Sequence, residues 1–224
     1  MSSASEPPAD AAMPRSALAP PPQAHTGGSW THRLARLCVR PLLGTPVTPN
    51  HLTTLRLLTG LGACLGVALG SREAEVWGGW LWVLSAFLDR ADGELARIGG
   101  KTTAWGHTYD YVCDTVVTPL FFLAAGIGLR DGLGWLGAVL GAIAGGAILV
   151  SNIWSETAER RMAPGRRIHD GAGGFDLDDL LYLLGPAAWL GWLAPLLVAA
   201  AIGAPAMAVL TWLKLRRLRA AGAL

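Results

Sequence analysis

Six long apolar stretches follow one another along the chain and constrain its fold more than any other feature. They run near residues 52–70, 76–91, 106–129, 133–154, 180–194 and 196–213. A helix needs about 20 residues, with a range of about 17–25, to cross a bilayer. The second and fifth stretches are short by this measure, unless polar residues that face water extend them. The sequence therefore predicts an all-α integral membrane protein with six transmembrane helices.

The composition agrees with this prediction. Hydrophobic residues make up 52% of the chain and charged residues only 15%, whereas a typical soluble domain is about 25% charged. The three Cys include no C-x-x-C pair, so neither a disulfide framework nor a zinc site is indicated. We expect membrane lipids, and no nucleic acid, among the partners.

The segment before the first apolar stretch divides into two parts. Its first part is rich in Pro, Ala and Ser, which is typical of a disordered tail. In the second, Arg33, Arg36 and Arg40 share one face of a helix that also carries apolar residues. This pattern favours an amphipathic helix on the membrane surface, although an ordinary linker helix is the alternative. The predicted parts are the tail 1–28, the amphipathic juxtamembrane helix 29–44, the six-helix membrane domain 45–219 and the C-terminal tail 220–224.

Basic residues predict the orientation in the membrane. With the amino terminus in the cytoplasm and six crossings, only Arg72 and Arg130 of the 18 Lys and Arg residues fall outside. Cytoplasmic loops carry an excess of these residues. We therefore expect both termini, and the polar stretch 87–117, to face the cytoplasm.

Two pairs of carboxylates flank the turn between the second and third apolar stretches. Asp89 and Asp92 are three residues apart, and Asp110 and Asp114 are four apart, so each pair shares one face of a helix. Four carboxylates that face one another would repel and resist ionising together. A divalent cation removes this problem, and oxygen ligands favour Mg²⁺ or Mn²⁺. Four carboxylates suffice for two ions. The alternative is that the Asp residues only cap helix ends.

This stretch resembles the signature of the CDP-alcohol phosphotransferases, D-x-x-D-G-x-x-A-R, eight residues, then G-x-x-x-D-x-x-x-D. Every fixed position is matched, by Asp89, Asp92, Gly93, Ala96, Arg97, Gly106, Asp110 and Asp114. A second segment, "TPNHLTTLR" at 48–56, resembles the P-N-x-x-T-x-x-R of many family members. The six-span layout also agrees with the family's fold.

The resemblance implies a membrane transferase that moves a phosphoalcohol from a CDP carrier to an acceptor hydroxyl and releases CMP. It implies that Asp89, Asp92 and Asp110 bind metal that holds the CDP pyrophosphate. Asp114 would also lie at the metal site and act as the general base. Contacts to CDP are implied for Asn50, Thr53, Gly93, Ala96, Arg97 and Gly106.

The acceptor is the least determined part of the prediction. A basic cluster after the fourth stretch is a candidate for binding a phosphate on the acceptor, since Arg suits bidentate contacts; the alternative is that it contacts anionic lipid. The cluster comprises Arg160, Arg161, Arg166 and Arg167.

The predicted function is phospholipid synthesis from CDP-diacylglycerol and a polar alcohol, in the bacterial inner membrane, with a homodimer implied by the resemblance. One alternative is a transferase of the same family that uses a CDP-linked polar alcohol and a lipid acceptor such as diacylglycerol. An alternative of another class is a divalent cation transporter, because intramembrane acids also mark ion pathways. The transporter alternative leaves the spacing of Gly93, Ala96 and Arg97 unexplained.

Overall fold

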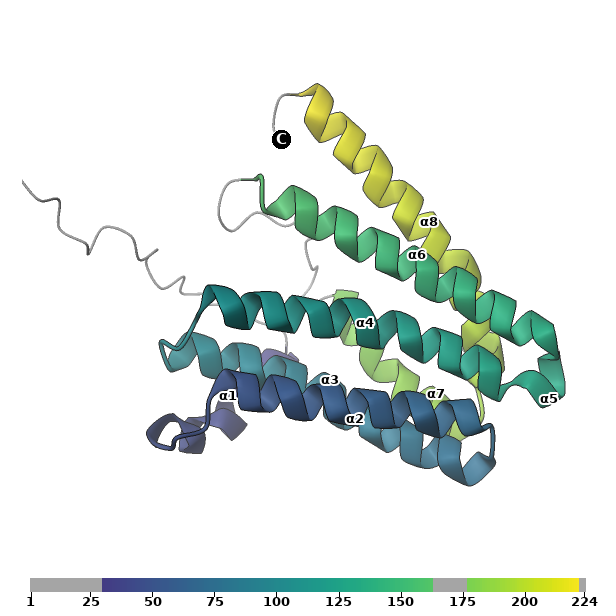
Figure 1. Cartoon of the computed structure of the whole chain (residues 1–224), viewed down its shortest axis with the longest axis horizontal. Helices are drawn as coiled ribbons and strands as arrows, with labels where there is room; N and C mark the ends of the chain where they lie inside the picture. The colour runs from purple at the N-terminus through teal and green to yellow at the C-terminus, as the bar shows by residue number, and fades with distance from the viewer. Residues whose placement is uncertain (1–29, 163–176, 222–224) are drawn as a thin grey trace, which may run out of the picture.

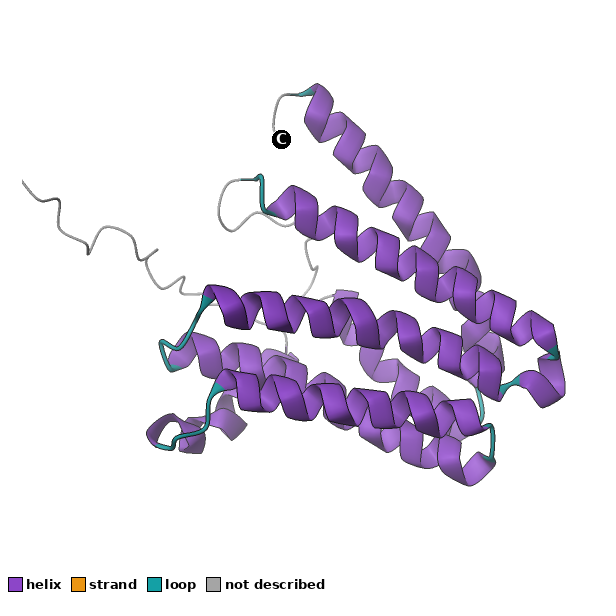
Figure 2. Ribbon diagram, viewed as in Figure 1, coloured by secondary structure: helices purple, strands orange, loops and turns teal. Residues whose placement is uncertain are grey.

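The structure is a computed structural model that describes residues 30–162 and 177–221, and within these residues it is helical with no strand (Figures 1 and 2). The tail 1–28, Arg166, Arg167 and residues 222–224 lie outside the described part. In chain order the elements are α1 (Trp30–Val39), η2 (Arg40–Gly44), α2 (Pro49–Leu69), α3 (Arg72–Ile98), α4 (Ala104–Gly128), α5 (Arg130–Leu133), α6 (Trp135–Glu159), η3 (Leu177–Leu183), α7 (Leu184–Leu190) and α8 (Leu193–Ala220).

Four of the described helices, α2, α4, α6 and α8, are long and apolar enough to cross a membrane. The second predicted span corresponds to α3, which has 27 residues but carries several charges in its last turns. Six crossings thus stay a prediction, while the all-helical membrane architecture agrees with the sequence.

The fifth predicted span, 180–194, is not one continuous α-helix. It consists of the 3₁₀ helix η3 and the seven-residue α7, which ends at Leu190 and is followed by Gly191 with a positive φ of 72°. Pro186 follows the junction of the two, and it lacks the N–H that an uninterrupted α-helix would need there. Gly191 adopts the left-handed conformation that commonly ends helices. The next helix, α8, therefore begins at Leu193 rather than near residue 196.

α2 packs against both α3 and α4 (Figure 1). α6 packs against α4, and α8 packs against α6. The short α7 and α1 both pack against α3. The start of α2, the end of α3, the start of α4 and the ends of α6 and α8 all point to the same end of the bundle (Figure 1). The basic clusters at these helix ends therefore share one side of the molecule.

Glycines allow α6 to approach the backbone of α4. A Cβ on Gly141 would lie 2.5 Å from the carbonyl oxygen of Phe122, and one on Gly145 would lie 2.5 Å from that of Pro119. These distances are too short for any side chain. The two glycines are four residues apart and share one helix face, which is the arrangement expected of small residues at membrane helix interfaces.

The predicted juxtamembrane helix 29–44 is divided in two. α1 ends at Val39, because Pro41 lacks the N–H that would continue the hydrogen bonds of this helix. Pro41 instead lies in the first turn of the 3₁₀ helix η2. Thr31, Ala35 and Val39 form the buried face of α1. Since α1 packs against α3, it lies close to the charged residues in the last turns of α3. Its placement on a membrane surface stays a prediction.

Candidate active site

The turn between α3 and α4 brings the two carboxylate pairs together. α3 ends at Ile98, and Gly100 has a φ of 61° that allows the chain to reverse. Thr103 then caps α4, since its hydroxyl accepts a hydrogen bond from the backbone N–H of Gly106 at 2.9 Å. The carboxylates of α3 and α4 thus meet near the same end of the bundle.

Three of the carboxylates have the geometry of a metal site. Asp89, Asp92 and Asp110 each offer an oxygen, and these oxygens lie within 4.8 Å of one another. Asp92 is buried, and the Thr53 hydroxyl donates to its Oδ2 at 2.8 Å. A close group of carboxylate oxygens with no nitrogen or sulfur ligand fits a hard divalent cation such as Mg²⁺ or Mn²⁺.

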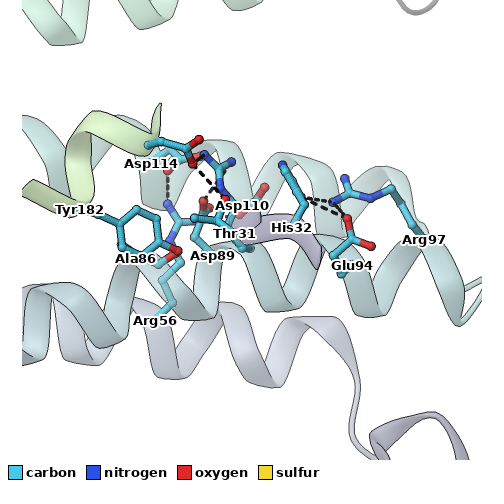
Figure 3. Close-up of polar contacts among 12 residues, drawn as sticks. Thr31, His32, Arg56, Ala86, Asp89, Glu94, Arg97, Asp110, Asp114 and Tyr182 are labelled. Carbon is cyan, nitrogen blue, oxygen red and sulfur yellow. Dashed lines mark hydrogen bonds and ion pairs between the residues drawn. The ribbon is translucent and has the colours of Figure 1, made fainter. Parts of the chain in front are cut away.

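Arg56 of α2 enters the space between α3 and α4 and contacts both of them (Figure 3). Its Nη1 lies 2.9 Å from Asp89 Oδ1 and 2.6 Å from Asp110 Oδ1, and its Nη2 pairs with Asp114. Arg56 is only 4% exposed. A buried guanidinium needs such partners, and the carboxylates need its charge to relieve their repulsion. Arg56 ends the P-N-x-x-T-x-x-R pattern, but the pattern alone does not predict its contacts with the carboxylates.

Two cavities meet at the carboxylates. The smaller has a volume of about 180 Å³, and Asp92 and Asp110 are part of its wall. The larger has a volume of about 510 Å³ and extends to Asp89 and Asp114. All six residues expected to contact CDP line the smaller cavity: Asn50, Thr53, Gly93, Ala96, Arg97 and Gly106. The structure thus brings this predicted set together.

Two glycines keep the smaller cavity open. A Cβ on Gly93 would lie 3.2 Å from the Arg97 guanidinium, and one on Gly106 would lie 3.1 Å from Asn50 Oδ1. Both contacts are tighter than an ordinary van der Waals approach. The small residues of the motif therefore leave room between polar groups that a larger residue would close.

A buried carboxylate next to the motif connects α1 to the cavity. Glu94 is 2% exposed, and Arg36 Nε and Arg97 Nη2 donate to it at 2.9 and 2.8 Å. His32 Nδ1 lies 3.1 Å from the same carboxylate (Figure 3). Burial, together with the charges of Arg90 and Arg97, lowers the pKa of His32. Glu94 occupies a variable position of the signature, so the motif gives no signal for this network.

The described arginines proposed for the acceptor do not line the larger cavity. Arg160 donates to Glu156 at 2.7 Å, and its guanidinium lies 5.9 Å from the centre of the Tyr111 ring. Arg161 instead lines a small pocket of about 30 Å³ with Leu215. Their assignment to the acceptor stays a prediction.

A family model described as CDP-alcohol phosphatidyltransferase matches residues 46–215. The chain is similar to the bifunctional IPC transferase and DIPP synthase of Aquifex aeolicus, with 28% identity over 73% of this chain and 38% of that protein. It is also similar to the protein of the same name from Thermococcus kodakarensis, with 30% identity over 58% of this chain and 32% of that protein. The chain thus spans about a third of the length of these relatives.

One solved structure shares the fold. It is the phosphatidylinositol phosphate synthase of Mycobacterium tuberculosis with CDP-DAG bound, which aligns with a TM-score of 0.59 at 20% identity. The alignment covers 84% of this chain and 92% of that one. At this level of identity the likeness concerns the fold.

Proposed function

Because the chain belongs to the CDP-alcohol phosphatidyltransferase family, we propose that it transfers the phosphatidyl group of CDP-diacylglycerol to a hydroxyl of a polar alcohol and releases CMP. The observation that carries this proposal is the position of the carboxylates. Asp110 lines both cavities, so a donor in the smaller cavity and an acceptor in the larger one would meet at the carboxylate group.

The chemistry follows from the residues around that junction. The acceptor oxygen attacks the phosphorus that carries the diacylglycerol, the bond from this phosphorus to the CMP phosphate oxygen breaks, and CMP leaves. Asp114, which lines the larger cavity, takes the hydroxyl proton. Arg97 lines both cavities and would bind a donor phosphate. Two Mg²⁺ or Mn²⁺ ions held by Asp89, Asp92, Asp110 and Asp114 would supply the charge neutralisation that phosphoryl transfer requires.

An apolar groove supports a lipid-linked donor. Its volume is about 390 Å³, and Trp30, Leu34, Trp80 and Phe87 contribute to its wall. Tyr182 lines both this groove and the larger polar cavity, so acyl chains in the groove would lie next to the reacting groups. The CDP-DAG bound to the structural relative supports the same donor.

Several further parts of the proposal rest on sequence pattern and family likeness. They are the cytoplasmic side of the site and both termini, the bacterial inner membrane, and a homodimer. The common direction of the basic helix ends supports a single cytoplasmic face.

Donor exchange tests this proposal against its alternatives. Purified protein in lipid vesicles is given Mg²⁺ and either CDP-diacylglycerol with a polar alcohol, or CDP-ethanolamine with diacylglycerol, and CMP is measured. We expect acceptor-dependent CMP release with CDP-diacylglycerol only. CMP from CDP-ethanolamine alone would establish the alternative donor. Flux of Mn²⁺ into the vesicles without any CMP would establish a transporter.

A further inference from the structure

Arg90 of α3 is a cation in the wall of the larger cavity to which the family signature gives no role. It occupies a variable position, directly after Asp89. Its side chain lines the larger cavity but not the smaller one, and the residue is only 9% exposed. A charge at such depth requires partners, and the partners of Arg90 show where in the cavity its guanidinium lies.

The first partner belongs to η3, which packs against α3. Arg90 Nη2 lies 3.7 Å from Asp179 Oδ1, and the Tyr182 hydroxyl donates to the backbone carbonyl of Ala86 at 2.9 Å. Asp179 and Tyr182 are three residues apart in a 3₁₀ helix, where such residues share a face. Ala86 and Arg90 are four apart on α3 and also share a face. The two contacts therefore run side by side, and the guanidinium lies next to Tyr182, which separates the cavity from the apolar groove.

The second partner belongs to the carboxylate group. Arg90 Nη1 lies 3.8 Å from Asp89 Oδ2, and Asp89 is one of the residues expected to hold metal. The guanidinium is thus positioned between the carboxylate group on one side and the apolar groove on the other. A guanidinium carries five N–H donors in one plane, so it can contact a phosphate together with the acids that position it.

This place is the one that the lipid-bearing phosphate of the donor requires. In the proposed function the CMP part occupies the smaller cavity and the acyl chains occupy the groove, so the phosphate between them lies along the wall from Gly93 to Tyr182. Gly93 lines both polar cavities and is three residues from Arg90. Arg97 also lines both cavities, whereas Arg56 contacts the carboxylates directly. Among the described arginines of the larger cavity, Arg90 is therefore the one that lies next to the groove.

We propose that Arg90 is a further catalytic residue, which binds the phosphate that carries the diacylglycerol, and that Asp179 is a positioning residue for its guanidinium. This inference rests on the proposed transferase function and adds two residues to its site. Arg97 then contacts the phosphate that leaves with CMP, while Arg90 contacts the phosphate that is transferred. The oxygens of the transferred phosphate carry negative charge during the attack, and a fixed guanidinium stabilises that charge.

Binding of CMP and CDP separates the two phosphates. CMP carries only the phosphate next to the nucleoside, and CDP adds the second one. Both are titrated by calorimetry into purified protein with Mg²⁺. We expect Arg90→Gln to raise the Kd of CDP at least about tenfold and to leave the Kd of CMP unchanged, whereas Arg97→Gln should raise both.

The matched control for binding is Arg33→Gln, which removes the same charge at an exposed position of α1 outside the walls of both cavities. Arg90→Lys keeps a charge and is the second variant, in case Arg90→Gln does not fold; its Kd for CDP should lie between those of wild type and Arg90→Gln. Equal weakening of CMP and CDP would indicate a general structural role and overturn the proposal. An unchanged Kd for CDP would overturn it as well.

Kinetics test the catalytic role. Loss of one stabilising donor costs about 100-fold or more in kcat, so we expect a fall of this size for CMP release from CDP-diacylglycerol in Arg90→Gln and a smaller one in Asp179→Asn. Because Asp179 acts through Arg90, the double variant should be no slower than Arg90→Gln alone. A wild-type kcat in Arg90→Gln, or fully additive effects, would overturn the assignment. A wild type that binds CDP but releases no CMP with any acceptor would instead contradict the transferase function itself.

Discussion

The guanidinium of Arg56 lies 2.6 Å from a carboxylate oxygen of Asp110, within the group of acids expected to bind metal. Arg56 also contacts Asp89 at 2.9 Å and is almost completely buried. A fixed positive charge of the protein thus occupies the centre of the carboxylate group and offsets part of the repulsion between its members.

Removal of this charge should destabilise the protein most strongly without metal. In Arg56→Ala the carboxylates lose their internal counter-charge, and loss of one partner of a buried ion pair costs about 3–5 kcal/mol. We expect the Tm in detergent and EDTA to fall by roughly 10 °C, with a larger recovery on addition of Mg²⁺ than the wild type shows. Arg56→Lys keeps the charge and should lose less. Equal Tm values for wild type and Arg56→Ala in EDTA would contradict this role.

Glu94 should control the affinity for the donor through Arg97. Glu94→Gln removes the charge that holds Arg97 at 2.8 Å and Arg36 at 2.9 Å. We expect the KM for CDP-diacylglycerol to rise about tenfold, while the KM for the acceptor stays the same. Glu73→Gln, at an exposed position of the same helix, is the control. If both variants gave the wild-type KM, the network would have no role in donor binding.

His32 should make stability depend on pH. Burial and the nearby arginines lower the pKa of His32 below the ordinary value of 6.5, so the unfolded chain binds a proton more readily than the folded one. Stability is then fully present above pH 6.5 and is lost as the pH falls through the lowered pKa. We expect the Tm difference between wild type and His32→Gln to change between about pH 7 and about pH 5. Parallel pH profiles would contradict the assignment.

The contact between α4 and α6 should not tolerate a side chain at Gly141. A Cβ there would collide with the Phe122 carbonyl, and overpacking typically costs about 1–3 kcal/mol. Gly141→Ala should therefore lower the Tm in detergent. Gly146→Ala is the matched control, because a Cβ at Gly146 meets nothing within 4 Å. Ala is a better helix former than Gly, so helix propensity alone should not lower the Tm of either variant. A Tm that did not fall further in Gly141→Ala than in Gly146→Ala would contradict the packing argument.

The carboxylate group could be predicted from the sequence because its geometry is local. Spacings of three and four residues determine the face of each helix, and the short turn with Gly100 brings the helix ends together. The Arg160–Glu156 pair is equally local, since the residues are four apart and ion-pair within one helix. Its spacing alone would have indicated that Arg160 is engaged by Glu156.

The remaining features depend on contacts between distant segments. Arg56 is separated from Asp110 by 54 residues and Arg36 from Glu94 by 58, so the pattern around each charge does not indicate its partner. Hydropathy also does not detect the change from η3 to α7 near Pro186, because residues 180–194 carry no charged side chain and are mostly apolar. The position of Arg90 beside Asp179 likewise follows from the packing of η3 on α3.

The most direct test of the central claim measures metal binding and CMP release on the same variants. Asp89→Asn, Asp92→Asn, Asp110→Asn and Asp114→Asn are compared with wild type, and Asp131→Asn, at an exposed position in α5, is the control. We expect the first three to lose both Mn²⁺ binding and CMP release from CDP-diacylglycerol. Asp114→Asn leaves the group of Asp89, Asp92 and Asp110 intact, so it should still bind Mn²⁺ at that group but lose CMP release by about 100-fold or more. CMP release that persists in EDTA, or in Asp114→Asn, would contradict the account.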